Sequence, residues 1–185
     1  MGVYKHIKDG VIIDSRETID ELLISKLIAK EWLPYIIQEE PEYNIDTQYL
    51  TSEPIINETN VVETYIINDY TSEELDERLS IKREMLLNTI NDEVNTYINT
   101  YYDTGTQQTF TAIYTQQNTP TSIKDYLDPV LVWISSIMSY YYGRKQNIID
   151  ATDITTLKAI TWDFTTFDTT KPDVSLQALM TLLSE

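Results

Sequence analysis

The chain has 185 residues, of which 42% are hydrophobic, so it can build one mid-sized domain or two small ones around an ordinary core. Its 30 Asp and Glu residues outnumber its 13 Lys and Arg residues, and the formal net charge of −17 disfavours nucleic acid and anionic membranes as partners. Because the chain has no cysteine and one histidine, disulfides, thiolate chemistry and the common zinc ligand sets are excluded.

A hairpin is expected at the N-terminus. In V-Y-K-H-I-K-D-G-V-I-I-D, residues 3–14, β-branched residues lie on both sides of Asp9-Gly10. Asp-Gly favours the two positive φ angles of a type I′ turn, so this stretch predicts two antiparallel strands joined by a tight turn.

A helix is expected after the hairpin. Thr18 and Glu21 form a capping-box pattern, and apolar residues keep helical spacing up to Trp32, before Pro34 ends the helix. The apolar residues with this spacing are Ile19, Leu22, Leu23, Leu27 and Ile28.

Three strand-like runs follow this helix. L-P-Y-I-I-Q (33–38), T-Q-Y-L-T (47–51) and V-V-E-T-Y-I-I-N (61–68) are separated by E-E-P-E-Y-N-I-D and S-E-P-I-I-N-E-T-N. Together with the hairpin and the helix, they predict a small α+β domain over residues 1–70.

A mostly α-helical, bundle-like domain is expected over residues 71–185, because the hydrophobic period changes from two to about 3.6 at this point. Thr71 and Glu74 form a second capping box. One long helix that ends before Gly105 is then predicted by apolar residues at intervals of three, four or seven: Leu75, Leu79, Leu86, Ile90, Val94, Tyr97 and Tyr101. This narrow stripe can pack on a neighbouring helix or on copies of itself, and we prefer the intramolecular interpretation.

Three more helices are expected toward the C-terminus. The first begins at Pro120 or at Asp128-Pro129, and we prefer the second start because proline kinks a helix interior. Its broad apolar face contains Val130, Trp133, Ile134, Ile137, Met138, Tyr141 and Tyr142. Asp153 is expected to cap a short helix, and Asp173 or Ser175 to cap the last one, whose core residues are Leu176, Leu179, Met180 and Leu183. The segment 101–128 matches no known pattern, and no element is assigned between Tyr101 and Pro120.

An aromatic segment, W-D-F-T-T-F-D (162–168), lies between the last two capped helices. We interpret Trp162, Phe164 and Phe167 as a strap that closes the end of the helical core, because each ring can bury on the order of 150 Å² or more. The alternative is a ligand platform with Asp163 and Asp168 as its polar rims.

Catalytic chemistry is not expected. His6 lies in the first strand without a serine or cysteine motif, so we interpret it as a structural histidine. Asp150 with Asp153, or Asp163 with Asp168, could in principle serve a glycosidase, but acidic residues are so abundant that such pairs arise by chance. No calcium-loop motif is present. We therefore expect no enzyme, and no catalytic, cofactor-binding or metal-binding residues.

A membrane segment or a signal peptide is not expected either. Charges interrupt the N-terminus where a signal peptide needs an apolar run. The longest apolar stretch, 130–138, contains two serines and is too short to span a bilayer.

Two parts of the sequence resemble short proteins that tailed bacteriophages encode beside their tail-fibre and baseplate genes. The first part comprises the Asp-Gly hairpin, E-E-P-E-Y-N-I-D-T-Q-Y-L and N-V-V-E-T-Y-I-I-N-D-Y-T-S-E-E-L-D-E-R-L-S-I-K-R. The second is W-D-F-T-T-F-D-T-T-K-P-D-V-S-L-Q-A-L-M, and together they cover about half of the chain. The resemblance implies a virion context more firmly than any mechanism.

Three functions are compatible with this resemblance. The first is a structural protein of the tail or baseplate, made in the bacterial cytoplasm and located in the virion, which acts as an adaptor for other tail, baseplate or fibre proteins. We expect it to be a homo-oligomer or part of a symmetric assembly. The second is a tail-fibre assembly chaperone that does not remain in the virion. The third is a glycan-binding or receptor-binding module, suggested by the tyrosines Tyr97, Tyr101, Tyr102, Tyr140, Tyr141 and Tyr142.

Overall fold

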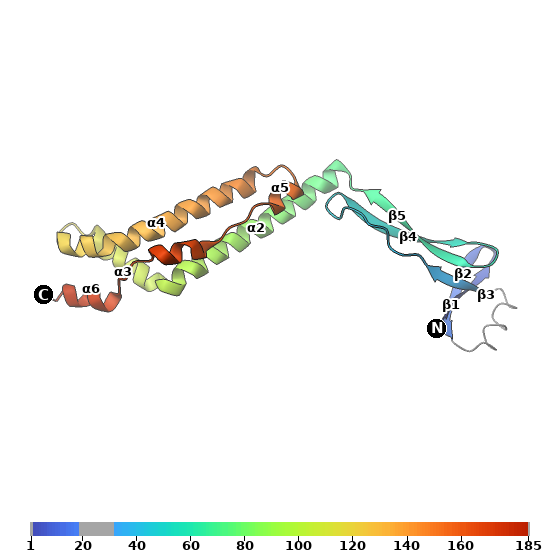
Figure 1. Cartoon of the computed structure of the whole chain (residues 1–185), viewed down its shortest axis with the longest axis horizontal. Coiled ribbons are helices and arrows are strands. Elements are labelled where there is room, and N and C mark those ends of the chain that lie inside the picture. Colours follow the sequence, from blue (N-terminus) through green and yellow to red (C-terminus); the bar gives the residue numbers. More distant parts are fainter. Residues whose placement is uncertain (1, 19–31, 185) are drawn as a thin grey trace. The chain divides into compact units, whose positions relative to one another are not determined.

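The chain divides into two compact units, Met1–Leu75 and Asp76–Glu185. The computed structural model describes residues 2–18 and 32–184. A five-stranded sheet forms the first unit and helices form most of the second (Figure 1), so the α+β class expected from the sequence is confirmed. The domain boundary expected after residue 70 lies a few residues before this division.

The sheet has the strand order β2-β1-β3-β5-β4. Its strands are β1 (Gly2–Lys8), β2 (Val11–Thr18), β3 (Trp32–Ile37), β4 (Gln48–Ile56) and β5 (Val61–Asp69). β3 and β5 are parallel, and the other neighbouring strands are antiparallel. Between β1 and β2, Asp9 and Gly10 have φ angles of 52° and 75°, which confirms the predicted tight turn.

The helix expected after β2 falls on residues 19–31, which lie outside the described residues, but its extension to Trp32 is wrong. Trp32 is the first residue of β3, where it lies opposite His6 of β1, and the two ring centroids are 4.9 Å apart. Long-range strand pairing has outweighed the local helical spacing. Pro34 therefore lies within a strand. It is tolerated there because β3 pairs with β5 only from Tyr35 onward.

The three predicted strands after the helix are confirmed as β3, β4 and β5. However, β4 continues to Ile56 through S-E-P-I-I, which we expected to belong to a connecting segment. The difference arises because β4 lies at the edge of the sheet, where proline is compatible with a strand. The connection from β4 to β5 is consequently reduced to residues 57–60.

The long helix α2 (Ser72–Tyr101) begins with the predicted capping box and ends before Gly105, as expected. The Thr71 N–H and hydroxyl donate to Glu74 Oε2 at 2.8 and 2.9 Å, and the Glu74 N–H donates back to the Thr71 hydroxyl oxygen at 3.3 Å. These hydrogen bonds lower the pKa of Glu74 and fix the first turn of the helix.

The rest of the second unit consists of α3 (Thr104–Thr115), α4 (Thr121–Asp150), α5 (Ile154–Lys158), the 3₁₀ helix η1 (Phe164–Thr170) and α6 (Leu176–Leu182). α3 occupies the segment to which the sequence assigned no element. The expected cap of α5 is confirmed, because the Asp153 carboxylate accepts from the Thr156 N–H at 2.7 Å. Of the two caps proposed for the last helix, Ser175 is the observed one.

The preferred start of α4 at Asp128-Pro129 is wrong. The helix begins at Thr121, directly after Pro120, and Pro129 lies in its interior. An interior proline costs a helix about 3 kcal/mol. The cost is offset because the first two turns bury Ile123 and Leu127 on the same side as Val130.

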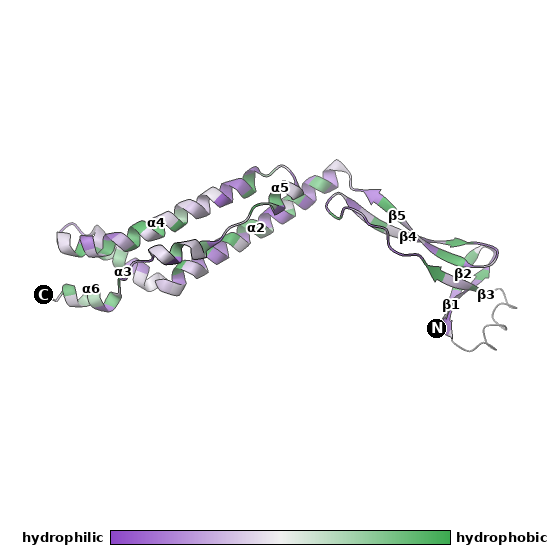
Figure 2. Ribbon diagram, viewed as in Figure 1, coloured by the Kyte–Doolittle hydropathy of each residue, from purple (hydrophilic) through white to green (hydrophobic). Residues whose placement is uncertain are grey.

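The core of the second unit lies between α2 and α4, which run side by side in opposite directions, with residues 151–184 returning along the pair (Figure 1). Hydrophobic residues recur along both helices (Figure 2). The buried stripe of α2, which includes Ile90, Val94 and Ile98, packs in the same core as residues of α4, in agreement with the intramolecular interpretation. None of the described helices combines the length and apolar character needed to cross a bilayer.

We expect the burial pattern of α4 to be visible in stability measurements. Ile137 is fully buried, whereas Ile149 on the same helix is 43% exposed. Ile137→Ala should lower the free energy of unfolding by about 3 kcal/mol, because it removes buried methyl groups and leaves a cavity. Ile149→Ala should cost less than about 1 kcal/mol. Urea denaturation followed by circular dichroism would measure both, and equal losses would contradict the observed helix orientation.

Candidate functional site

The aromatic segment lies against the C-terminal part of α2 and the middle of α4 and not at an end of the core, which corrects the predicted position of the strap (Figure 1). Phe164 is buried, with its ring centroid 5.9 Å from that of Tyr97 on α2 and 5.8 Å from that of Tyr140 on α4. The Trp162 indole N–H donates to Glu93, which is also on α2. Sequence spacing alone could not show this, because the strap is part of a segment that returns along both helices.

Aromatic side chains of α2, of the residue that follows α2 and of α4 hold this returning segment by hydrogen bonds. We call them the aromatic cluster: Tyr97, Tyr101, Tyr102, Tyr126, Trp133 and Tyr140. The Trp133 indole N–H donates to the Phe167 carbonyl at 3.0 Å, and the Tyr102 hydroxyl donates to the Pro172 carbonyl at 2.8 Å. The Tyr140 and Tyr126 hydroxyl oxygens accept from the backbone N–H groups of Asp163 and Ser175 at 3.2 and 3.1 Å. These four hydrogen bonds satisfy backbone N–H and C=O groups that an irregular segment leaves without partners in regular secondary structure.

Asp168 is the point where two tyrosines meet. The hydroxyls of Tyr97 and Tyr101 both donate to its Oδ1 atom, at 2.6 and 2.7 Å. These bonds lower the pKa of the Asp168 carboxyl. Burial, followed by the bond to Asp168, raises the pKa of Tyr97, and the bond to Asp168 raises that of Tyr101. The two phenols therefore stay protonated and the carboxylate stays charged, which is the pairing that a hydrogen-bonded anchor needs.

These contacts favour a structural strap over a ligand platform. A ring that serves as a platform must offer a free face, but Phe164 is buried and Phe167 packs against the core. The two expected rims are also occupied, because Asp163 caps η1 by accepting from the Thr165 N–H and Asp168 holds the two tyrosines. Among the six tyrosines suggested for sugar stacking, Tyr142 is the most exposed, at 57%.

The carboxylates considered for glycosidase chemistry have hydrogen-bond partners of their own. Asp153 is the cap of α5, and Asp150 accepts from the Gln146 amide at 2.9 Å. His6 stacks on Trp32 in the sheet. Within the described residues, no group of three or more His, Asp or Glu side chains is arranged to hold a metal ion.

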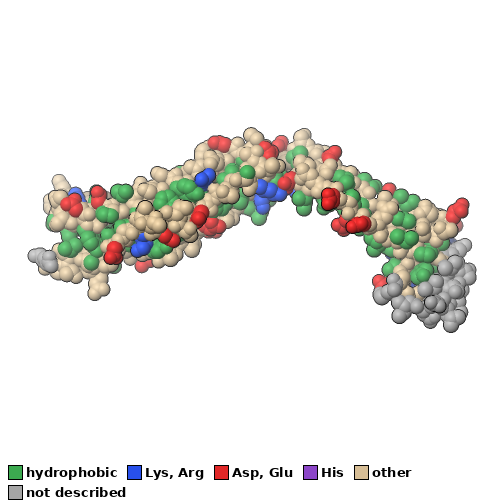
Figure 3. Space-filling view, in the orientation of Figure 1, with side chains coloured by type: hydrophobic (Ala, Val, Ile, Leu, Met, Phe, Trp, Pro, Cys, Tyr) green, Lys and Arg blue, Asp and Glu red, His purple; other side chains and the backbone are tan. Residues whose placement is uncertain are grey.

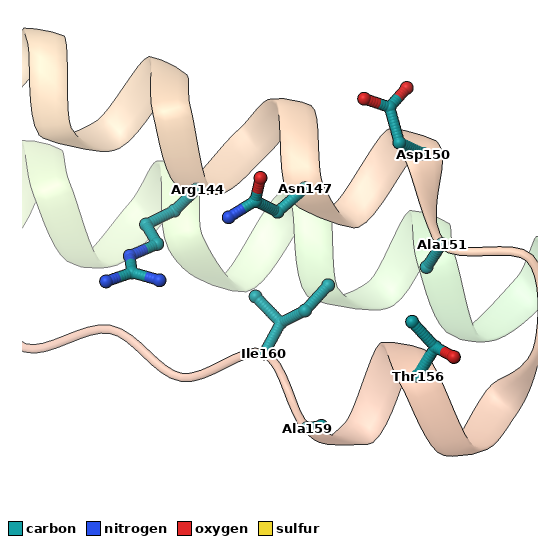
Figure 4. Close-up of a pocket in the computed structure, with 7 residues that line it drawn as sticks. All are labelled: Arg144, Asn147, Asp150, Ala151, Thr156, Ala159 and Ile160. Carbon is teal, nitrogen blue, oxygen red and sulfur yellow. The ribbon is translucent and has the colours of Figure 1, made fainter.

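A groove of about 450 Å³ lies between the C-terminal end of α4 and the segment that follows α5 (Figure 4). Ala151 and Ile160 provide apolar surface, and Arg144 and Asn147 extend toward the groove from α4, whereas the Asp150 carboxylate points away. The Arg144 guanidinium lies 5.0 Å from the centroid of the Tyr140 ring. One guanidinium in an open groove does not define a ligand, so we assign none.

A second groove, of about 490 Å³, lies between α4 and η1 and is mainly apolar. Pro129, Val132, Trp133 and Phe167 line it together with three hydroxyl residues, Ser136, Thr166 and Thr170. Each of these hydroxyls donates to a nearby backbone carbonyl, at 2.9, 3.0 and 3.1 Å. Their donors are thus used within the chain, and the groove lacks the convergent polar groups that orient a small ligand.

The sheet unit is built differently from the helical unit, because few of its described side chains are buried. Within residues 2–18 and 32–75, the buried apolar residues are Tyr4, Trp32 and Val61. Isoleucines on all strands except β1 are instead exposed by 38 to 61%: Ile13, Ile36, Ile37, Ile55, Ile66 and Ile67. Figure 3 displays one face of this unit, where apolar side chains gather over the strands and carboxylates lie at the margins.

One polar row crosses the sheet. The Lys5 ammonium lies 4.4 Å from the centroid of the Tyr35 ring, the Tyr35 hydroxyl donates to Glu63 at 2.6 Å, and the Ser52 hydroxyl donates to the same carboxylate. The bond to Glu63 raises the pKa of Tyr35 to about 12, and the bonds from Ser52 and Tyr35 lower the pKa of Glu63. The row thus ties β1, β3, β5 and β4 together.

Comparisons of the chain with protein-family models, with curated protein sequences and with solved structures found no match. The described structure has two features that bear on function. In the helical unit, the polar atoms of the aromatic cluster form hydrogen bonds within the chain. The sheet exposes apolar side chains to solvent.

We expect Asp168→Asn to lower the thermal unfolding midpoint at neutral pH, because the substitution removes the charge that accepts from two tyrosines. The folded-state pKa of Asp168 is lowered from its ordinary value of 3.8, so its stabilisation is present above that value and is lost as pH falls through the folded-state pKa. The difference between wild type and variant should therefore be seen at about pH 7 and be smaller at an acidic pH below the ordinary value of 3.8.

Asp92→Asn, a change of another exposed carboxylate on the same helix as the two tyrosines, is the control. It should change the midpoint little at either pH. A difference for Asp168→Asn that is equally large at both pH values would contradict the role given to its charge.

Proposed function

We propose that the chain is a structural protein of a bacteriophage tail or baseplate and acts as an adaptor that binds other tail, baseplate or fibre proteins. The observation that carries this proposal is the exposed apolar surface of the sheet unit. Large apolar areas left in water are costly, and they mark sites where a protein meets a partner. The resemblance of two sequence segments to phage proteins encoded beside fibre and baseplate genes supplies the virion context.

The two units differ in how much apolar surface they bury, and this difference supports an adaptor role. The helical unit buries Phe110, Leu127, Ile137 and other apolar residues in a core of its own. The sheet unit has no comparable core among its described residues, so part of its apolar surface remains for another protein. A stable unit joined to an incomplete one suits a protein that holds neighbours in an assembly.

The internal use of the aromatic cluster makes a glycan-binding role less favoured. Sugar recognition needs exposed ring faces beside free polar groups, whereas the hydroxyls of Tyr97, Tyr101 and Tyr102 are bonded within the chain. No described feature favours a chaperone over a virion component, so the experiment must separate these two.

Mass spectrometry of purified particles of the phage that encodes the chain tests the proposal. We expect peptides of this chain in the mature virion, in a fixed ratio to a tail or fibre protein and resistant to washing with salt. Absence from virions together with co-purification with the fibre protein from infected cells would identify an assembly chaperone instead. Absence from both, with binding on a glycan array, would favour the receptor-binding alternative.

A further inference from the structure

Three apolar side chains form a row across the sheet. In the pairing of the strands, Ile36 of β3 lies beside Val62 of β5, and Val62 lies opposite Ile55 of β4. Paired residues of neighbouring strands point to the same face, so these three side chains are adjacent on one face. Ile36 and Ile55 are 46% and 44% exposed, and Val62 is half-buried between them. We call this group the apolar row.

The edges of the sheet are less suited to a partner than this face is. Pro54 removes one N–H donor from the edge strand β4. On the other edge, the pairing of β1 with β2 shifts between His6 and Ile7, which leaves Ile13 without an opposite residue and interrupts the regular edge. Prolines and bulges of this kind hinder the addition of a further strand. A partner is therefore expected to dock on the face and not to extend the sheet.

Carboxylates lie on the strands and loops next to the apolar row. Glu53 lies two residues before Ile55 on β4 and so on the same face, Glu39 and Glu40 follow β3, and Glu58 lies in the loop between β4 and β5. All four are exposed. The cations of β1 and β2 lie away from the apolar row. Lys5 is on the opposite face, over the Tyr35 ring, Arg16 lies over the ring of Trp32, four residues before Ile36, and Lys8 is at the hairpin end of β1. The row thus has an acidic border.

We propose that the apolar row is the docking surface for a partner protein that presents an apolar ridge bordered by Lys and Arg. This inference rests on the proposed function and specifies the partner. Charge complementarity selects this occupant over a second copy of the chain, because two copies, each with a formal net charge of −17, would bring acidic borders together. The apolar row would provide the apolar area that is buried in the complex. The acidic border would orient the partner and select one that carries Lys and Arg.

A synthetic peptide with alternating Lys and Leu, labelled with fluorescein, is a suitable probe for the full chain. We expect binding by fluorescence anisotropy that weakens as salt is raised. Peptides with alternating Glu and Leu, or Lys and Ser, should bind at least about tenfold more weakly, because each lacks one of the two required features.

Matched variants decide whether the apolar row is the site. Ile36→Ser with Ile55→Ser should weaken binding of the Lys-Leu peptide by at least about tenfold. Ile37→Ser with Ile67→Ser changes two isoleucines of comparable exposure on the opposite face and should leave binding unchanged. All four positions are exposed, so the folds of both variants should persist, which circular dichroism would check.

Three outcomes would overturn the proposal. Equal loss in both variants would show non-specific attraction, and equal binding of the Glu-Leu peptide would show that the acidic border plays no role. A dimer in sedimentation that Ile36→Ser with Ile55→Ser dissociates would identify a second copy as the occupant. None of these outcomes depends on finding the chain in virions, so the docking surface and the virion role can fail separately.

Discussion

The helical unit depends on the hydrogen bonds between its aromatic side chains and the segment that returns along α2 and α4. Two packed helices leave one side of their apolar surface uncovered. Residues 159–175 cover that side largely without regular α-helix, so many of their backbone groups need partners. A tyrosine or tryptophan provides both requirements at once, since its ring buries apolar area and its polar atom reaches the backbone. This explains why Trp133 and Tyr102 donate to carbonyls while Phe164 packs against the rings of Tyr97 and Tyr140.

Local sequence patterns predicted most helices, strands and turns. The features that differ from the prediction depend on contacts between residues far apart in the sequence. The Asp9-Gly10 turn and the Thr71–Glu74 capping box were predictable because each depends on neighbours within a few residues. The role of Asp168 was not predictable, because Tyr97 and Tyr101 lie 71 and 67 residues away in the sequence. Pro129 shows the same limit, since its tolerance depends on burial of the turns before it and not on the residues beside it.

The strands of the sheet unit have a sequence pattern that also predicts exposed apolar residues. Its strands contain runs such as Y-I-I and V-V-E-T-Y-I-I, in which consecutive apolar residues point to opposite faces. Strands with one solvated face alternate between apolar and polar residues, whereas runs of this kind indicate that both faces are suited to burial. The presence of apolar residues on both faces can therefore be predicted from the strand sequences. The position of the carboxylates relative to the apolar row cannot, because it depends on how the strands pair.

The placement of cations over aromatic rings has a consequence for the behaviour of the protein in solution. Six described Lys and Arg side chains lie over rings: Lys5, Arg16, Lys124, Arg144, Lys145 and Lys171. Cations held in this way help to order the fold, and even with their charges counted the formal net charge is −17. Mutual repulsion then keeps separate molecules dispersed at neutral pH, and colloidal stability falls toward the isoelectric point of about 4.2, where that repulsion disappears.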